Sequence, residues 1–194
     1  MPRLRIAVIL VLILCCVNVA RSQDEPFPTE DEVKLLVTQI DRAMKSYKPL
    51  IDEEEIRLGK AGVEAVAKDR QVVHAVEIAI EALQKRPDGF NSAGGFALFE
   101  WLDDASRNAL LCASTSLTQA TVLMMAGETG KASSLIHLAQ SCMDAGNLIY
   151  TVSENAGALY ERYVEAEQKL AEKSFNVAQK CTAALKKTSP ANKH

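Results

Sequence analysis

The sequence from Asn108 to Gly127, NALLCASTSLTQATVLMMAG, contains no charged residue. After the segment 128–131 comes a second stretch of low charge, Ala132 to Ser153, which only His137 and Asp144 interrupt. The rest of the chain after its N-terminal leader is densely charged. This pattern predicts that the two stretches form the central antiparallel helix pair of an all-α bundle, with charged helices packed around them.

The first central helix is predicted over residues 96–126. Leu110, Leu117 and Met124 are seven residues apart, and Ala113 and Ala120 lie between them. This spacing predicts a heptad seam in which small residues occupy alternate layers.

The second central helix is predicted over residues 131–187 and is the longest element. Its apolar positions alternate steps of three and four residues from Leu135 to Leu170, and the phase then shifts by one residue. A straight helix of this span would be about 85 Å long, far longer than its partner. We therefore expect a kink or break near Gly146 or Gly157.

Two charged helices are predicted before the central pair. The first, residues 30–47, begins with the capping-box spacing of Thr29 and Glu32 and ends before Pro49, because the residue before a proline disfavours helical geometry. The second covers residues 52–85, and Gly59 and Gly62 predict an irregular or closely packed start. The apolar stripes of these two helices are Val33, Leu36, Val37, Ile40, Met44 and Tyr47, and Ile56, Val63, Val66, Val73, Val76, Ile80 and Leu83.

Residues 87–89, Pro-Asp-Gly, form a turn signal, and residues 90–95 are the loosest connection. No segment shows the alternation of a strand. The predicted fold is therefore an antiparallel bundle of about four helices over residues 30–187, preceded by an extended leader (residues 23–29) and followed by a flexible tail (residues 188–194).

The first 22 residues resemble a secretory signal peptide. Arg3 and Arg5 form a positive n-region, residues 6–17 are apolar, and Ala20-Arg21-Ser22 fits a small-x-small cleavage pattern. We expect a secreted protein that begins at Gln23, with an uncleaved N-terminal anchor as the alternative. The apolar run is short for a membrane span, so stable membrane insertion is not expected.

Cleavage would change the charge balance. The 22 basic residues become 19 without Arg3, Arg5 and Arg21, against 25 acidic ones, so the formal net charge moves from −3 to −6. An acidic chain is not expected to bind nucleic acid or anionic membranes as its main partner.

Three cysteines follow the signal segment, an odd number for a secreted chain. Placing the turn near Thr129 puts Cys112 about 17 residues before it and Cys142 about 13 after it, which is about 6 Å of axial offset. A Cys112–Cys142 disulfide is the leading pairing, with Cys181 free or in an intermolecular bridge. Three buried thiols acting as small apolar side chains are the alternative.

Other candidate sites have simple structural explanations. His74 and Glu77 are expected to form an exposed helical pair rather than a metal site. Glu100 and Asp104 fit the acidic first turn of a helix, and the single tryptophan, Trp101, fits a core anchor. Clustered methionines mark some binding surfaces, but we expect Met124, Met125 and Met143 in the core.

No phosphate-binding loop, nucleophile elbow, HExxH or CxxC motif is present. The sequence therefore predicts a secreted, non-enzymatic protein without cofactor or metal, acting through protein binding or self-association. The alternative is an extracellular carrier of a lipid or other apolar ligand held between helices.

Overall fold

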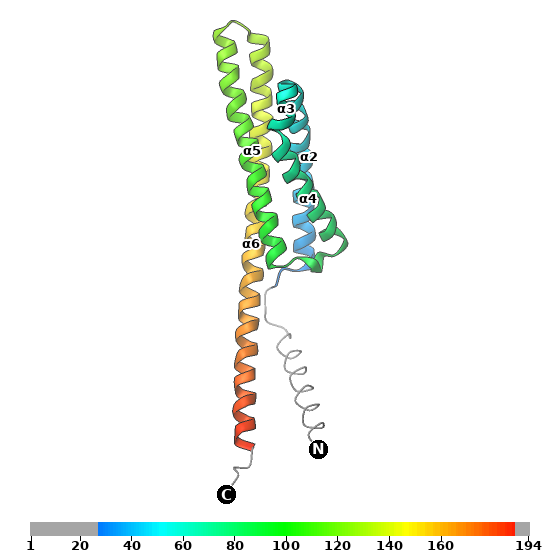
Figure 1. Cartoon of the computed structure of the whole chain (residues 1–194), viewed down its shortest axis with the longest axis vertical. Coiled ribbons are helices and arrows are strands. Elements are labelled where there is room, and N and C mark those ends of the chain that lie inside the picture. Colours follow the sequence, from blue (N-terminus) through cyan, green and yellow to red (C-terminus); the bar gives the residue numbers. More distant parts are fainter. Residues whose placement is uncertain (1–26, 189–194) are drawn as a thin grey trace. The chain divides into compact units, whose positions relative to one another are not determined.

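The computed structural model describes residues 27–188 and is helical throughout, without a strand in that range. The predicted signal peptide, most of the leader and residues 189–194 lie outside the described residues. The elements, labelled in Figure 1, are α2 (Glu30–Leu58), α3 (Lys60–Ala65), α4 (Ala67–Lys85), the 3-10 turn η1 (Pro87–Gly89), α5 (Ser92–Met125) and α6 (Thr129–Thr188).

The chain divides into two compact units. One unit, Pro28–Tyr160, contains α2 to α5 and the first half of α6, and all the sites discussed below lie within it. The described part of the other unit consists of Phe27 and residues 161–188. Within it the rings of Phe27 and Tyr163 meet edge-on, with centroids 5.2 Å apart.

Helix α2 begins at the predicted capping box. The Thr29 amide donates to the Glu32 carboxylate over 2.8 Å, and the Glu32 amide donates to the Thr29 hydroxyl over 3.3 Å. The predicted end of this helix at Pro49 is wrong, because α2 continues to Leu58. A proline inside a helix loses one backbone hydrogen bond. Burial of the flanking apolar residues, among them Tyr47 and Ile51, offsets this loss. The predicted stripe is confirmed as buried: Val33, Leu36, Val37, Ile40, Met44 and Tyr47.

The chain reverses at Gly59 rather than at Pro49. Gly59 has φ of 61°, a left-handed conformation that favours glycine. Gly62 then packs so closely on α2 that a Cβ atom there would lie 2.5 Å from the Glu55 carbonyl oxygen. The predicted start of the second helix at residue 52 is wrong, because residues 52–85 are divided between α2, α3 and α4. The irregular, closely packed segment predicted from Gly59 and Gly62 is confirmed. Ile56 and Val63, predicted to be buried, are 81% and 60% exposed.

Helices α2 and α4 run antiparallel after this reversal. Ion pairs join Lys48 to Glu77 over 2.7 Å and Arg70 to Asp52 over 2.7 Å. The apolar face of α4 is buried as predicted at Val73, Val76 and Ile80. The predicted Pro-Asp-Gly turn is η1, and it leads into α5.

Helix α5 begins four residues earlier than predicted. The side chain of Asn91 accepts a hydrogen bond from the Gly94 amide over 2.8 Å and caps the helix. Gly95 allows the Phe90 ring to lie against the first turn, since a Cβ atom there would be 2.8 Å from that ring. The sequence FNSAGG is therefore a capped helix start rather than a loose connection.

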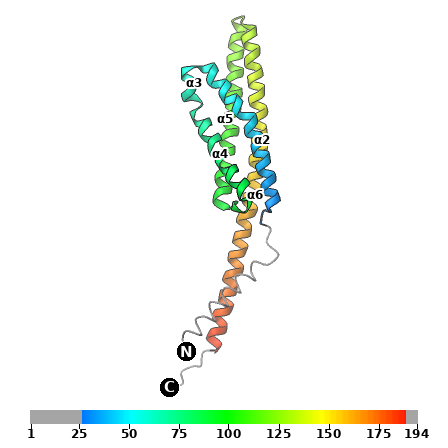
Figure 2. The same ribbon diagram turned by 90° about the vertical axis from the view of Figure 1, so that its right-hand side faces the viewer.

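Helices α5 and α6 form an antiparallel hairpin closed at Gly127. The Glu128 amide donates to the Leu123 carbonyl and the Gly127 amide to the Met124 carbonyl, with Gly127 at φ of 80°. This is a Schellman termination of α5. Figures 1 and 2 show α5 and the first part of α6 side by side, with their joined end extending past α3.

Helix α6 continues as one α-helix through Gly146 and Gly157, so the expected break is not found at either glycine. A kink there remains a prediction. Within the unit Pro28–Tyr160, the predicted apolar stripe of this helix is buried from Leu135 to Leu159. In residues 27–188, none of the helices combines the length and apolar character that a bilayer span requires.

Candidate interaction surface and thiol pair

The α5 side of the interface with α6 is built from small side chains, which pack against Leu135, Leu138 and Cys142 of α6. The predicted seam positions Ala113 and Ala120 are each 2% exposed, and Ser106, Ala109 and Ser116 are also buried. The other half of the predicted seam is wrong, since its large members are partly exposed: Leu110 39%, Leu117 40% and Met124 56%. Helices that pack through alanine and serine approach closely, so bulky residues lie at the edges of the contact rather than within it.

Backbone-level contacts confirm this close approach. The Ser106 hydroxyl donates to the Gly146 carbonyl oxygen over 3.0 Å. A Cβ atom on Gly146 would lie 3.0 Å from the Leu110 side chain and 3.4 Å from the Ala109 side chain. Further along, the Ser153 hydroxyl donates to the Phe99 carbonyl over 3.4 Å. The hairpin interior is thus filled by the side chains of its own two helices at these levels.

One side of α5 carries its polar contacts to the preceding helices. Asn108 donates to Asp69 on α4, the Cys112 thiol lies 3.6 Å from the Glu54 carboxylate on α2, and Gln119 accepts from Arg57 on α2. At 100° per residue, Leu110, Leu117 and Met124 lie on the opposite side of the same helix. This side faces away from α2 and α4.

Helix α6 presents a matching row beside it. Ile136, Met143 and Tyr150 are spaced by seven residues and are 42%, 36% and 52% exposed. On the surface of α6 these three residues lie next to the stripe that contains Gly146, and Gly146 is packed against Leu110 of α5. The α6 row is therefore adjacent to the exposed row on α5. We call the two rows together the hairpin face: Leu110, Leu117 and Met124 on α5 with Ile136, Met143 and Tyr150 on α6.

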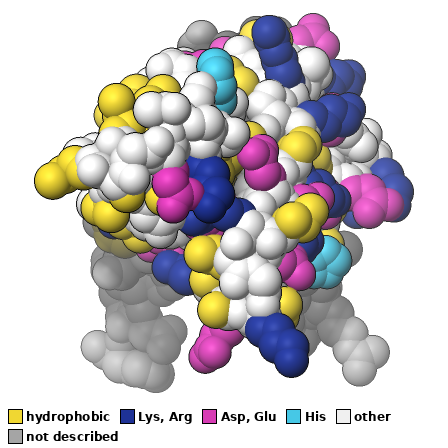
Figure 3. Space-filling view, turned by 90° about the horizontal axis from the view of Figure 1, so that it is seen from above, with side chains coloured by type: hydrophobic (Ala, Val, Ile, Leu, Met, Phe, Trp, Pro, Cys, Tyr) yellow, Lys and Arg dark blue, Asp and Glu magenta, His cyan; other side chains and the backbone are white. Residues whose placement is uncertain are grey.

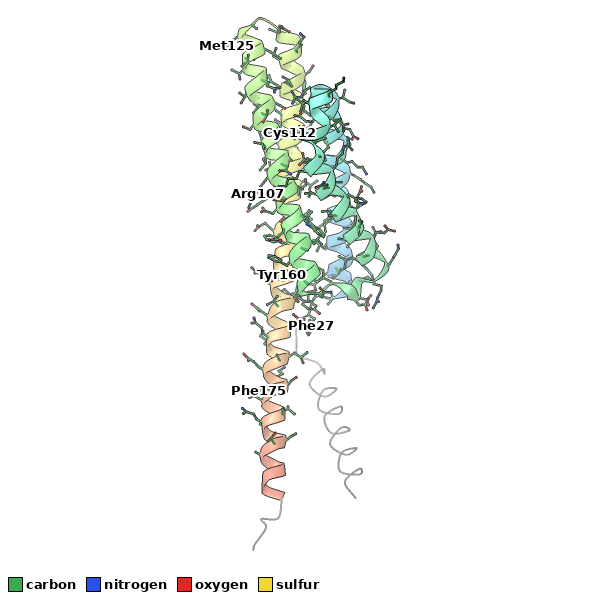
Figure 4. All side chains as sticks on the ribbon, viewed as in Figure 1. Phe27, Arg107, Cys112, Met125, Tyr160 and Phe175 are labelled. Atoms are coloured by element: carbon green, nitrogen blue, oxygen red, sulfur yellow. The ribbon has the colours of Figure 1, made fainter. Side chains whose placement is uncertain are left out.

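The side of α5 turned away from α2 and α4 can be followed in the figures. In Figure 4, Arg107 and Met125 lie on the side of α5 turned away from α2 and α4, whereas Cys112 lies on the inner side. Figure 3 looks down on the joined end of the hairpin, and hydrophobic side chains gather toward its left side.

The three methionines are not core residues. Met124, Met125 and Met143 are 56%, 86% and 36% exposed, so the prediction that they fill the core is wrong. The small seam leaves no room between the helices for their long side chains. Methionine is flexible and polarizable, and exposed methionines are typical of surfaces that adapt to a binding partner.

The hairpin face is uncharged along its length and is bounded at each end by an ion pair. Arg107 pairs with Asp103 over 2.6 Å at one end, and Lys131 pairs with Glu128 at the other. The side chains of Arg107 and Lys131 are each 74% exposed. The surface is therefore an apolar strip with a neutral pair of opposite charges at either end.

The two predicted disulfide partners face each other across the seam. The Cys112 and Cys142 sulfur atoms are 2.9 Å apart, and both residues are free thiols in this structure. The expected axial offset is not present, because the turn centre is Gly127 and both cysteines are 15 residues from it. The structure brings these two together; Cys181 is an exposed thiol in the other unit.

Charged groups from α2 flank the thiol pair. Glu54 is an ion-pair partner of Arg57, and their side chains are only 14% and 22% exposed. The pKa of Cys142 is lowered, chiefly by its hydrogen bond with the Cys112 thiol. The pKa of Cys112 is raised by the same hydrogen bond and by burial.

A second polar group lies where α2, α4 and α5 meet. Tyr47 is 2% exposed, and burial together with the nearby Asp69 carboxylate raises its pKa. Desolvation raises the pKa of Asp69 above 3.8, although hydrogen bonds from Asn108 and Tyr47 oppose the shift. Sequence reasoning missed this group because its three members are far apart in the chain.

The raised pKa of Asp69 predicts a pH dependence of stability. Folding disfavours the ionised carboxylate, so the contribution of Asp69 to stability is largest below pH 3.8 and falls as the pH rises through the raised pKa. In Asp69→Asn this fall is removed, so the stability of the variant relative to wild type should increase with pH over this range. Urea unfolding of both proteins from acidic to neutral pH measures the difference; parallel curves would contradict it.

The remaining candidates are placed as follows. His74 is exposed, and Glu77 pairs with Lys48 on α2. Glu100 is exposed, and Asp104 pairs with Lys68 on α4 over 3.4 Å. Trp101 is partly buried. Among the described residues, no group of three or more His, Cys, Asp or Glu side chains is arranged to hold a metal ion.

Comparison with known proteins assigns no relative to the chain: no protein-family model, curated protein or solved structure matches it.

Proposed function

We propose that the chain is a secreted, non-enzymatic protein, an antiparallel helical bundle that works by self-association through its hairpin face. The observation that carries this proposal is an apolar strip of six partly exposed side chains on a helix pair whose interior is already filled. Exposed apolar strips with polar ends are typical of protein interaction sites. A second copy of the same chain is the partner that the charges favour.

The charge distribution supports a second copy as the occupant. The chain is acidic, with a formal net charge of −3, so most of its surface repels another copy. The hairpin face is free of charge between its two end pairs, so two such faces meet without burying an unpaired ion. A partner of any other kind would need a comparable uncharged strip.

A two-fold axis near Leu117 also matches the ends of the strip. Such an axis is the commonest symmetry of homodimers and places the same surface on both sides of the contact. It brings the Asp103–Arg107 pair of one copy to the Glu128–Lys131 pair of the other. Each carboxylate then gains a basic group of the partner within reach.

The size of the strip fits a dimer of ordinary interface area. From Asp103 to Glu128 the face is about 38 Å long, and two adjacent helices are roughly 20 Å wide. The footprint is therefore roughly 750 Å² per copy, close to the ~800 Å² per partner of standard interfaces.

Self-association is tested by sedimentation of protein collected from the medium of cells that express the full chain. Wild type should show a monomer–dimer equilibrium that depends on concentration. In Leu117→Asp the dissociation constant should rise roughly a hundredfold or more, because an uncompensated carboxylate would be buried. Ile78→Asp is the matched control, since Ile78 is 55% exposed on α4 and lies outside the hairpin face; it should dimerise like wild type.

The outcomes separate the alternatives. A wild-type monomer at every concentration would overturn self-association and leave a different protein partner. Recovery of the secreted chain with a bound lipid, lost in Leu117→Asp, would favour the carrier of an apolar ligand. A ligand held between α5 and α6 would have to displace the contacts of Gly146 with Leu110 and Ser106.

The same preparation tests secretion. The positive n-region, the apolar run and the small residues before Gln23 support removal of residues 1–22. The intact mass of protein from the medium should correspond to a chain starting at Gln23. Retention of the full-length chain in the cell membrane would contradict secretion and favour an uncleaved anchor.

A further inference from the structure

The thiol pair has the geometry of a reactive couple. The two sulfur atoms are 2.9 Å apart and lie on opposite helices, equidistant from the hairpin turn. Cys142 is fully buried, whereas Cys112 is partly exposed. Of the two residues, only Cys112 has surface exposed to solvent.

We propose that Cys112 and Cys142 form a reversible dithiol–disulfide couple that exchanges with small-molecule disulfides, with Cys112 as the entry thiol and Cys142 as the resolving thiol. This inference is independent of the hairpin face and of secretion. It extends the predicted disulfide to a reversible exchange reaction with a defined order of steps.

The reaction takes place in two exchange steps. The Cys112 sulfur attacks one sulfur of a disulfide RSSR, the S–S bond of RSSR breaks, and the first RS⁻ leaves. The proton of Cys112 passes to a Cys142 thiolate, whose sulfur is 2.9 Å away, as this attack occurs. Cys142 then loses that proton and attacks the Cys112 sulfur of the mixed disulfide, releasing the second RS⁻.

The two steps conserve atoms and electrons and need no further reactant. One Cys112–Cys142 bond replaces the bond of RSSR, the two thiol protons end on two molecules of RSH, and the protein dithiol is oxidised as RSSR is reduced. A reducing thiol at high concentration reverses both steps. Solvent access sets the order, because RSSR reaches Cys112 but not the buried Cys142.

The groups around the pair support this assignment of roles. The Cys112 hydrogen bond and, to a smaller extent, Arg57 lower the pKa of Cys142, whereas burial and the Glu54 and Glu53 carboxylates act to raise it. The Ser116 hydroxyl is fully buried and has no hydrogen-bond partner among the described residues. It lies one turn after Cys112, and its nearby hydroxyl opposes the rise in the pKa of Cys112 that Cys142 and burial cause. It would thus stabilise a Cys112 thiolate.

The test equilibrates the folded full chain carrying Cys181→Ser with oxidised glutathione, blocks free thiols by alkylation, and maps peptides by mass spectrometry. We expect a Cys112–Cys142 cross-link, loss of two hydrogen atoms, and full reversal by reduced glutathione. Wild type should give the same cross-link, since Cys181 takes no part. Alkylation of both Cys112 and Cys142 after equilibration would overturn the proposal, as would a cross-link of Cys142 to Cys181 in wild type.

Two variants test the roles of the thiols. Cys142→Ala should accumulate glutathione on Cys112, because no resolving thiol releases it. Cys112→Ala should leave Cys142 unmodified in the folded protein and modified after unfolding in urea. Circular dichroism checks that both variants are folded. Equal rates of glutathione addition to Cys142 and Cys112 in folded variants would contradict the entry and resolving roles.

Discussion

Replacement of Ile149 by alanine is expected to lower the free energy of unfolding by about 2–5 kcal/mol. Ile149 is 0% exposed and is one of the largest fully buried side chains in the part of the chain that the structure describes. Its neighbours are helical and closely packed, so they cannot collapse into the cavity that the truncation leaves. Urea unfolding followed by circular dichroism measures the change.

Ile136→Ala is the matched control, on the same helix and with the same atoms removed. Ile136 is 42% exposed on the hairpin face, so the loss of stability in the monomer should be below about 1 kcal/mol. Its effect should instead be a weaker dimer. Equal destabilisation of the monomer by the two substitutions would mean that the hairpin face is part of the interior.

Gly62→Ala is expected to be destabilising by roughly 1–3 kcal/mol or more, against the trend of helix propensity. In an open helix position alanine is better than glycine by up to about 1 kcal/mol. At Gly62 the new Cβ atom would lie 2.5 Å from the carbonyl oxygen and 2.9 Å from the Cα atom of Glu55. These are backbone atoms of α2, so α2 and α3 must move apart.

Gly130→Ala provides the comparison for that prediction. Gly130 is in the first turn of α6, and a Cβ atom there meets nothing within 4 Å. This variant should be neutral or more stable by about 0.4–1 kcal/mol. If both glycine variants were stabilising, the close packing of α3 on α2 would be wrong.

The helical class, the capping box at Thr29 and the buried stripes of α2 and α6 follow from the sequence because they depend on local spacing. The boundaries at Pro49 and Gly59 do not. Proline opposes a helix locally, but burial of Tyr47 and Ile51 on one continuous face favours it. Rules based on local sequence include the effect of proline but do not include the burial of residues by tertiary packing.

The candidate site was predictable only in part. The pairing of Cys112 with Cys142 could be inferred from a hairpin, although the turn was placed two residues late. The α5 row of the hairpin face was assigned to the interior, because Leu110, Leu117 and Met124 have the spacing of a seam. The positions between them, Ala113 and Ser116 with Ala109, are small enough for closer packing, which places the large residues outside. A heptad pattern alone does not say which of two adjacent stripes is buried.

The seam of small side chains leaves the alignment of α5 along α6 to a few polar groups. Successive layers of alanine and serine are nearly alike in volume, so a slip by one helical turn would preserve most of the packing. Such a slip would leave the hydroxyl groups of Ser106 and Ser153 buried without the carbonyl oxygens of Gly146 and Phe99. An unpaired buried hydroxyl costs about 1–3 kcal/mol. The hydrogen bonds of these two serines therefore favour one of several similar alignments of α5 along α6.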